Sequence, residues 1–181
     1  MFQIHRLFKV STLLFSLLLV GALTLAQEKS PDRQRSMEKL SHFAGEWQGN
    51  GWMMMRNGEK SEFTQTESVE GKLDNTILVI EGEGKTPDSR KVHQAFGIIS
   101  AGAEPGQYRL QSYLATGQMT TADATLDSAG QFIWWFEDGR GGTIRYTTVV
   151  TKDTWTETGE YSHDGETWRQ FLGMQLKRMS K

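Results

Sequence analysis

The chain has 181 residues, with 20 basic and 22 acidic side chains, 19 glycines, 3 prolines and no cysteine. This composition excludes a disulfide scaffold, a collagen-like or long disordered chain and a strongly basic nucleic-acid-binding protein. One domain is expected at this length, and a net charge of −2 gives no reason to expect nucleic acid as a partner.

Residues 1–26 have the pattern of a secretory signal peptide. Arg6 and Lys9 come first, and the apolar stretch Leu13–Leu23 follows. This stretch is shorter than the roughly 20 apolar residues of a membrane-spanning helix, and small residues precede a cleavage site before Gln27. The pattern therefore predicts cleavage, no stable membrane insertion afterwards, and a secreted or periplasmic protein. Its stability must come from its core, because it has no cysteine for disulfides.

A polar segment and a short helix are predicted to follow the signal peptide. Residues 27–36 are polar and are interpreted as a flexible leader, which leaves residues 37–181 as a single domain. Met37, Leu40 and Phe43 recur at helical spacing, with Ser36 as a candidate N-cap. We expect this helix to cover one end of the domain, and Trp47 to plug the same end.

Turn signals recur about every ten residues through the rest of the chain. They fall at 56–59, 71–75, 83–91, 101–107, 115–117, 127–130, 138–142, 151–153 and 162–166. Several contain Asn-Gly or Asp-Gly, which favour hairpins because both residues adopt positive φ readily. Nine turns predict about ten short strands, and no segment between them has a convincing helical period.

The segments between the turns alternate as strands do. Phe63, Gln65, Glu67 and Val69 share one face in the first clear example. Further faces are formed by Phe132, Trp134 and Phe136, by Trp155, Glu157, Gly159 and Tyr161, and by His93, Ala95, Gly97 and Ile99. The chain is thus expected to be all-β, an antiparallel up-and-down β-barrel, since closure removes exposed strand edges. A two-sheet sandwich is the alternative.

Several ordered segments resemble a known family. They are GEWQGNGW at 45–52, FTQTESV at 63–69, ILVIEGEG at 77–84, VHQAFGIIS at 92–100, RYTTVV at 145–150 and TWRQFLGMQLKR at 167–178. In this order they resemble the DUF1579-type family of uncharacterised bacterial proteins, over most of residues 40–178. The resemblance implies a calycin-like barrel, similar to lipocalins and fatty-acid-binding proteins, and it implies no activity.

The opening Gly-x-Trp-x-Gly-x-Gly is also similar to that of the haem-binding, nitrobindin-like barrels. An axial histidine near the C-terminal end holds haem in that group, whereas residues 168–179 contain no histidine. No cofactor is therefore expected. No histidine or cysteine spacing typical of a metal site occurs, and neither does a Gly-x-Ser-x-Gly elbow, so no catalytic residue is assigned. Gly49, Gly51, Gly82 and Gly84 lie in or at the ends of strands and are interpreted as sites of close packing or curvature.

Five side chains are candidates for ligand binding. They are Glu67, His93, Trp134, Arg145 and Glu157. His93 lies on a face of small residues, and an inward Arg145 would pair with Glu67 or Glu157 or receive a ligand carboxylate. The alternatives are a histidine and charges held by neighbouring strands or facing solvent, and aromatic side chains that only fill the core.

Three hypotheses on function follow. The first is a barrel that binds a small hydrophobic or amphipathic molecule. The second is an enzyme on the same barrel, with His93 or Glu67 as a general base. The third is an interaction module whose barrel is filled by side chains. The first is preferred because of the aromatic faces, the number of strands and the calycin-like opening.

Overall fold

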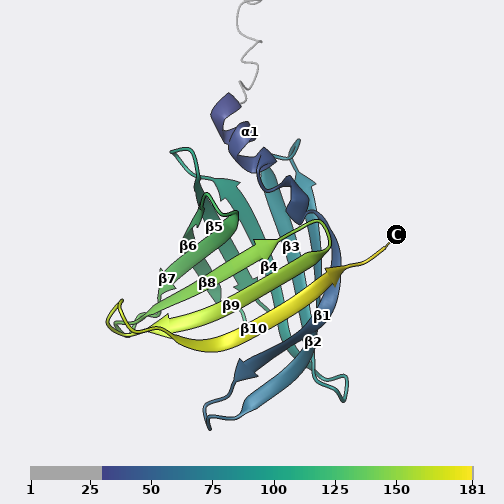
Figure 1. Cartoon of the computed structure of the whole chain (residues 1–181), viewed down its shortest axis with the longest axis vertical. Coiled ribbons are helices and arrows are strands. Elements are labelled where there is room, and N and C mark those ends of the chain that lie inside the picture. Colours follow the sequence, from purple (N-terminus) through teal and green to yellow (C-terminus); the bar gives the residue numbers. More distant parts are fainter. Residues whose placement is uncertain (1–29, 181) are drawn as a thin grey trace, which may run out of the picture.

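The computed structural model describes residues 30–180. The predicted signal peptide, 1–26, and residues 27–29 of the predicted leader lie outside the described residues. Figure 1 shows a barrel of strands with the N-terminal helix α1 (Pro31–Glu38) over one end. Neither α1 nor the short 3₁₀ helix η1 (Ser41–Phe43), the helices of the described part, is long and apolar enough to cross a membrane.

Ten strands form the barrel in the described part of the chain. They are β1 (Gly45–Met54), β2 (Lys60–Lys72), β3 (Ile77–Lys85), β4 (Lys91–Ala101), β5 (Gln107–Leu114), β6 (Met119–Leu126), β7 (Gln131–Glu137), β8 (Thr143–Val150), β9 (Thr154–Ser162) and β10 (Arg169–Arg178). Each strand pairs antiparallel with the next, and β1 pairs with both β2 and β10. This confirms the calycin-like, up-and-down barrel and excludes the sandwich.

The closure leaves no long strand edge free, which is the physical reason for preferring a barrel. Strand β1 closes the barrel, because its Trp52 lies opposite Gly173 of β10 on one side and opposite Glu62 of β2 on the other. Each of the nine connections overlaps one predicted turn signal. In the turn between β7 and β8, for example, the Asp138 carboxylate accepts hydrogen bonds from the backbone N–H groups of Arg140 and Gly142.

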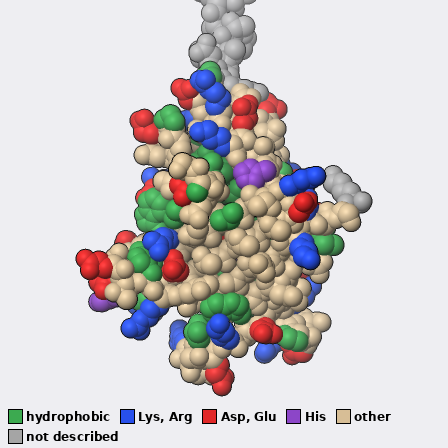
Figure 2. Space-filling model, viewed as in Figure 1, with side chains coloured by type: hydrophobic (Ala, Val, Ile, Leu, Met, Phe, Trp, Pro, Cys, Tyr) green, Lys and Arg blue, Asp and Glu red, His purple; other side chains and the backbone are tan. Residues whose placement is uncertain are grey.

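The outer face of the barrel is polar where β9 and β10 lie side by side. Thr156, Thr158 and Gln175 belong to this face. Figure 2 shows that the charged side chains on this side gather at the hairpins and near α1, whereas the middle of the face carries few charges. Inward residues alternate with these polar ones, so the strands are amphipathic, as antiparallel strands with one solvated face are.

The N-terminal helix begins earlier than predicted. α1 starts at Pro31 and includes most of the segment interpreted as a flexible leader. Proline suits a first helical turn, and Arg35 forms an ion pair with Asp32 one turn away. Ser36 therefore lies within the helix and is not its N-cap. It is buried, and its carbonyl accepts a hydrogen bond of 2.8 Å from the Tyr108 hydroxyl.

The predicted apolar face is buried, although two short helices carry it. Met37 belongs to α1, Leu40 lies between the helices, and Phe43 ends η1. These three residues pack with Trp47, Tyr108, Phe132 and Trp155, which together form the closed-end cluster. The ring of Phe43 meets Trp155 edge-on at 5.3 Å, an arrangement favoured by the charge distribution of aromatic rings. The cluster seals the barrel beneath α1, and Trp47 plugs this end as predicted.

Candidate functional site

A cavity of about 560 Å³ occupies the barrel between the closed-end cluster and the opposite end. Phe43, Phe132 and Trp155 form its floor, and Met55 and Arg90 from two hairpins lie at its mouth. The cavity contradicts the hypothesis of a barrel filled by side chains. Its volume falls within the range of small-molecule sites, which is about 300–1,000 Å³.

An aromatic wall borders the cavity along β7 and β8. The Trp134 ring stacks on Tyr146 with centroids 4.0 Å apart and on Phe136 with centroids 6.1 Å apart. All three side chains line the cavity, because they lie on the inward faces of two paired strands. Trp134 thus belongs to the site and not only to the core, and the stack gives the cavity a flat, rigid apolar surface.

Two polar side chains on β2 also face the cavity. Gln65 and Glu67 alternate with outward threonine and serine residues, and they are only 2% and 8% exposed. The Gln65 amide donates a hydrogen bond of 2.8 Å from Nε2 to Oε1 of Glu67. Gln65 Oε1 is buried and accepts no hydrogen bond from any residue within 30–180. A buried acceptor without a donor is costly, so this oxygen is a candidate ligand contact.

Glycines of β3 make room for these two side-chain ends. A Cβ at Gly82 would lie 2.7 Å from Oε2 of Glu67, and a Cβ at Gly84 would lie 2.8 Å from Oε1 of Gln65. At Gly49 of β1, by contrast, a Cβ would lie 2.1 Å from the backbone oxygen of Gln175. The two glycine pairs, interpreted alike from the sequence, therefore differ: Gly82 and Gly84 shape the site, whereas Gly49 allows close approach of strands.

A second carboxyl in the cavity lining, the partly buried Glu157, comes from β9. Thr148, its direct partner across the pair with β8, donates a hydrogen bond of 2.8 Å to Oε2 of Glu157. The surface that Glu157 keeps faces the cavity, since its strand neighbours on the same face are the buried Trp155 and Gly159. Burial raises the pKa of Glu157, against the opposing effects of the Thr148 hydroxyl and the nearby Trp155 indole.

The two carboxyl groups act on each other electrostatically. Burial, and then the charge of Glu157, raise the pKa of Glu67 to about 8, although the hydrogen bond from Gln65 opposes the shift. Burial and the same Glu157 charge also raise the pKa of Tyr146. Two like charges in a poorly solvated space disfavour double ionisation, so the empty cavity favours a protonated Glu67 at neutral pH.

His93 lines the cavity from β4. Burial lowers its pKa, which favours the neutral imidazole at pH 7. Next to it on the same face are the small residues Ala95 and Gly97, so the predicted open volume beside the histidine is present. His93 therefore adds no fixed positive charge to the interior of the barrel. Arg90, which carries such a charge, is exposed in the hairpin at the mouth.

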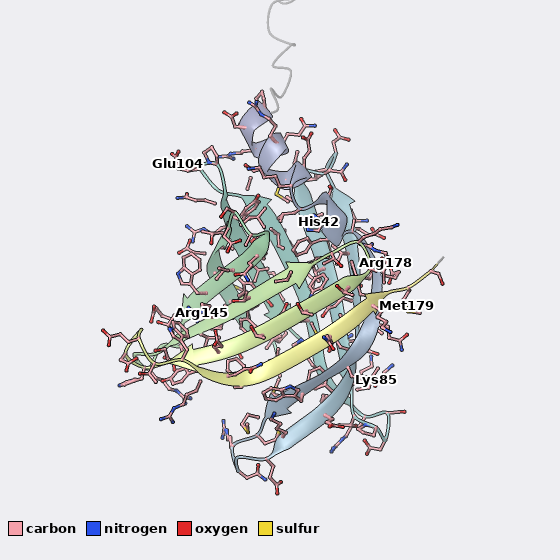
Figure 3. All side chains as sticks on the ribbon, in the orientation of Figure 1. His42, Lys85, Glu104, Arg145, Arg178 and Met179 are labelled. Atoms are coloured by element: carbon pink, nitrogen blue, oxygen red, sulfur yellow. The ribbon has the colours of Figure 1, made fainter. Side chains whose placement is uncertain are left out.

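Arg145 does not line the cavity, contrary to the prediction. It lies on the outer face of β8, near the end of the barrel away from Arg178 and His42 (Figure 3). Its guanidinium forms an ion pair of 2.8 Å with Glu160 and lies 3.7 Å from the centre of the Trp168 ring. The neighbours Ile144 and Tyr146 are the inward residues here. The interior carboxyls therefore have no partner in Arg145.

Sequence reasoning missed three polar residues of the site. Gln65 lies on the same strand face as Glu67. The one indication of its role in the sequence is that this face carries a second polar residue between Phe63 and Val69. Thr148 and Tyr146 lie in TIRYTTVV, which has β-branched residues on both faces and no readable inward side. Their role depends on the pairing of β8 with β9, which a single strand does not reveal.

The assembled site combines an apolar wall with a small acidic and amide region. It accepts hydrogen bonds at Glu67, Glu157 and Gln65, and the Trp155 indole lies close to Glu157. Within the same residues, no group of three or more His, Asp or Glu side chains is placed to hold a metal ion. The arrangement is suited to orient a molecule with one polar, hydrogen-donating end.

The fold has known counterparts. Comparison with family models gives no match, and comparison with curated protein sequences gives none either. Among solved structures, Rv2717c from M. tuberculosis is similar, with a TM-score of 0.67 and 14% identity over 84% of this chain and 100% of that one. The S-type phycobiliprotein lyase CPES from Guillardia theta has a TM-score of 0.58 and 10% identity over 82% and 97%. These likenesses show the fold, and the chain is a calycin-like β-barrel.

Proposed function

We propose that this protein binds one small amphipathic molecule inside its barrel. The observation that carries the proposal is the cavity of about 560 Å³ with the Trp134–Tyr146 stack on one side and Gln65 and Glu67 on another. A mostly apolar pocket with a few convergent polar groups is the usual form of a small-molecule site. Burial of the ligand's apolar part would contribute roughly 25 cal/mol per Å², and the polar groups would fix its orientation.

We also propose that the protein is exported and that it is related to the DUF1579-type proteins. The features that support export are Arg6, Lys9 and the apolar stretch over 13–23, followed by small residues before Gln27. The order of the six segments between 45 and 178 supports a relationship to the DUF1579-type proteins. Expression of the full chain in a bacterium, followed by fractionation and N-terminal sequencing, tests export. A mature N-terminus at Gln27 in the periplasm or medium is expected, and an intact Met1 in the cytoplasm would contradict it.

Binding inside the barrel is tested by filling the cavity. Ala95 faces inward from β4, and the adjacent Gln94 faces outward on the same strand. The Ala95→Trp variant should bind the uncharged fluorophore N-phenyl-1-naphthylamine at least about tenfold more weakly than the parent. The Gln94→Trp variant adds the same ring outside and should bind as the parent does. Equal affinity in all three proteins, each folded by circular dichroism, would overturn the proposal.

A further inference from the structure

The polar region of the cavity includes three side chains whose oxygens can accept hydrogen bonds from a ligand. Glu67 and Glu157 contribute carboxyl oxygens from β2 and β9, and Gln65 contributes its amide oxygen. Gln65 is only 2% exposed, and its Nε2 donates a hydrogen bond to Glu67. Its amide oxygen, Oε1, receives no hydrogen bond from the described residues. A ligand that donates hydrogen bonds would satisfy it.

The residues that line the cavity place no buried positive charge beside these acceptors. Five ionisable side chains line the cavity: Glu67, Arg90, His93, Tyr146 and Glu157. Arg90 is exposed at the mouth, and the charge that acts on Glu67 is that of Glu157. Burial favours neutral His93, and Tyr146 stays protonated. The carboxyl pair therefore has no positive partner within the described lining, and a buried carboxylate requires one to be stable when ionised.

We propose that the molecule bound in the barrel is an alkylamine, whose ammonium group sits between Glu67, Glu157 and Gln65 Oε1 and whose apolar tail lies along the Trp134 wall. This inference rests on the proposed function. The ammonium group supplies the missing positive charge and up to three N–H donors, which matches the acceptors present. A carboxylate-headed ligand would add a negative group beside Glu157, and a neutral alcohol would form no charge-assisted hydrogen bond with either carboxylate.

Ionisation of Glu67 accompanies this binding. A carboxyl that is protonated in the empty cavity must release its proton to hold an ammonium group at full strength. Binding of a cationic amine near pH 7 is thus expected to release protons, whereas binding of an alcohol is not. Calorimetry in two buffers of different ionisation enthalpy measures this release directly.

The test compares three ligands that differ only at one end: n-decylamine, n-decanol and n-decanoate. At pH 8 the amine keeps its proton, as a lysine side chain does. The experiment uses the full mature chain, and the affinity for each ligand is measured by displacement of N-phenyl-1-naphthylamine. The amine should bind at least about tenfold more tightly than the alcohol and the acid, because charge-assisted hydrogen bonds form only with its head group.

Three variants locate the head group. Glu67→Gln and Glu157→Gln keep the side-chain shape and remove one negative charge each, and both should weaken decylamine binding at least about tenfold while changing decanol binding by less than about threefold. Glu160→Gln is the matched control, since Glu160 lies on the same strand as Glu157 but pairs with Arg145 on the outer face. It should leave both affinities unchanged.

The outcomes separate this inference from the proposed function. Preferential binding of decylamine that both glutamine variants weaken supports the inference. Equal binding of the three ligands, tighter binding of decanol or decanoate, or amine binding that neither variant affects overturns it and leaves the proposed function standing. If none of the three ligands binds, and the fluorophore does not bind either, the proposed function itself fails.

Discussion

The guanidinium of Arg178 lies 3.9 Å from the centre of the Trp47 ring, so the end of the last strand covers the start of the first. The same group donates hydrogen bonds to the carbonyls of His42 at 2.7 Å, Ala44 at 2.6 Å and Lys152 at 2.6 Å. Arg178 therefore joins η1, β1 and the hairpin before β9 at the closed end, away from the mouth of the cavity.

Replacing Arg178 should destabilise the barrel without affecting its cavity. Arg178→Ala loses three hydrogen bonds and the ring contact, so the free energy of unfolding should fall by about 2–4 kcal/mol. Urea denaturation followed by tryptophan fluorescence measures the change. Lys177→Ala, a substitution of the exposed neighbour, is the control and should stay within about 0.5 kcal/mol of the parent. A loss no larger than the control's would contradict the assigned role.

The Tyr108 hydroxyl should hold α1 on the barrel. Tyr108→Phe removes the donor to the Ser36 carbonyl and leaves that buried acceptor unsatisfied, which should cost about 1–3 kcal/mol. Limited proteolysis within α1 should accelerate accordingly. Tyr113→Phe on the same strand removes an exposed hydroxyl and serves as the matched control. Identical cleavage rates in the two variants would show that this hydrogen bond does not secure the helix.

Stability should fall as the pH rises because of Glu67. Its folded-state pKa of about 8 lies above the ordinary value of 4.5, so the folded protein keeps a proton that the unfolded chain releases between these values. The contribution is fully present below pH 4.5 and is lost as the pH rises through 8. From pH 5 to pH 8 the free energy of unfolding should fall by roughly 3 kcal/mol through this group.

Glu67→Gln should flatten this pH dependence. The variant has no proton to lose at this position, so its stability should decline less between pH 5 and pH 8 in urea denaturation. Glu157 remains and keeps part of the decline, since burial raises its pKa in the same direction. Glu160→Gln should follow the parent curve. Parallel curves for the parent and Glu67→Gln would mean that Glu67 is not buried as a protonated acid.

Two glycine-to-alanine substitutions should differ in kind. At Gly49 the new methyl group would overlap the backbone of β10, which cannot yield, so Gly49→Ala should cost about 3 kcal/mol or more or prevent folding. At Gly82 it would meet only the end of the Glu67 side chain, which can rotate. Gly82→Ala should therefore fold with a loss of about 1 kcal/mol and weaken decylamine binding. Equal losses of stability in both variants would contradict this distinction.

Local sequence patterns were sufficient for the strands and for most inward faces. Turn residues such as Asn57-Gly58 mark the hairpins, and alternation on single strands placed Glu67, His93, Trp134 and Glu157 on faces that the closed barrel turns inward. Alternation failed at Arg145 because residues 143–150 include β-branched side chains on both faces of the strand, and hydrophobicity does not distinguish inside from outside there.

The meeting of Glu67 and Glu157 required the three-dimensional structure. These residues are far apart in the sequence and lie on strands separated by β1 and β10 in the barrel order. Only closure of the sheet turns both toward one space, and only the register fixes their depth. The start of α1 at Pro31 likewise depends on packing against the barrel, since the polar segment 31–36 has no apolar period of its own.

A crystal structure of the mature protein grown with n-decylamine tests the central claim most directly. The account predicts one molecule inside the barrel, with its nitrogen within about 3.2 Å of carboxyl oxygens of Glu67 or Glu157 and its chain against the Trp134 ring. An empty interior, or a molecule bound solely in the polar groove on the outside near Gln48 and Asn50, would contradict it.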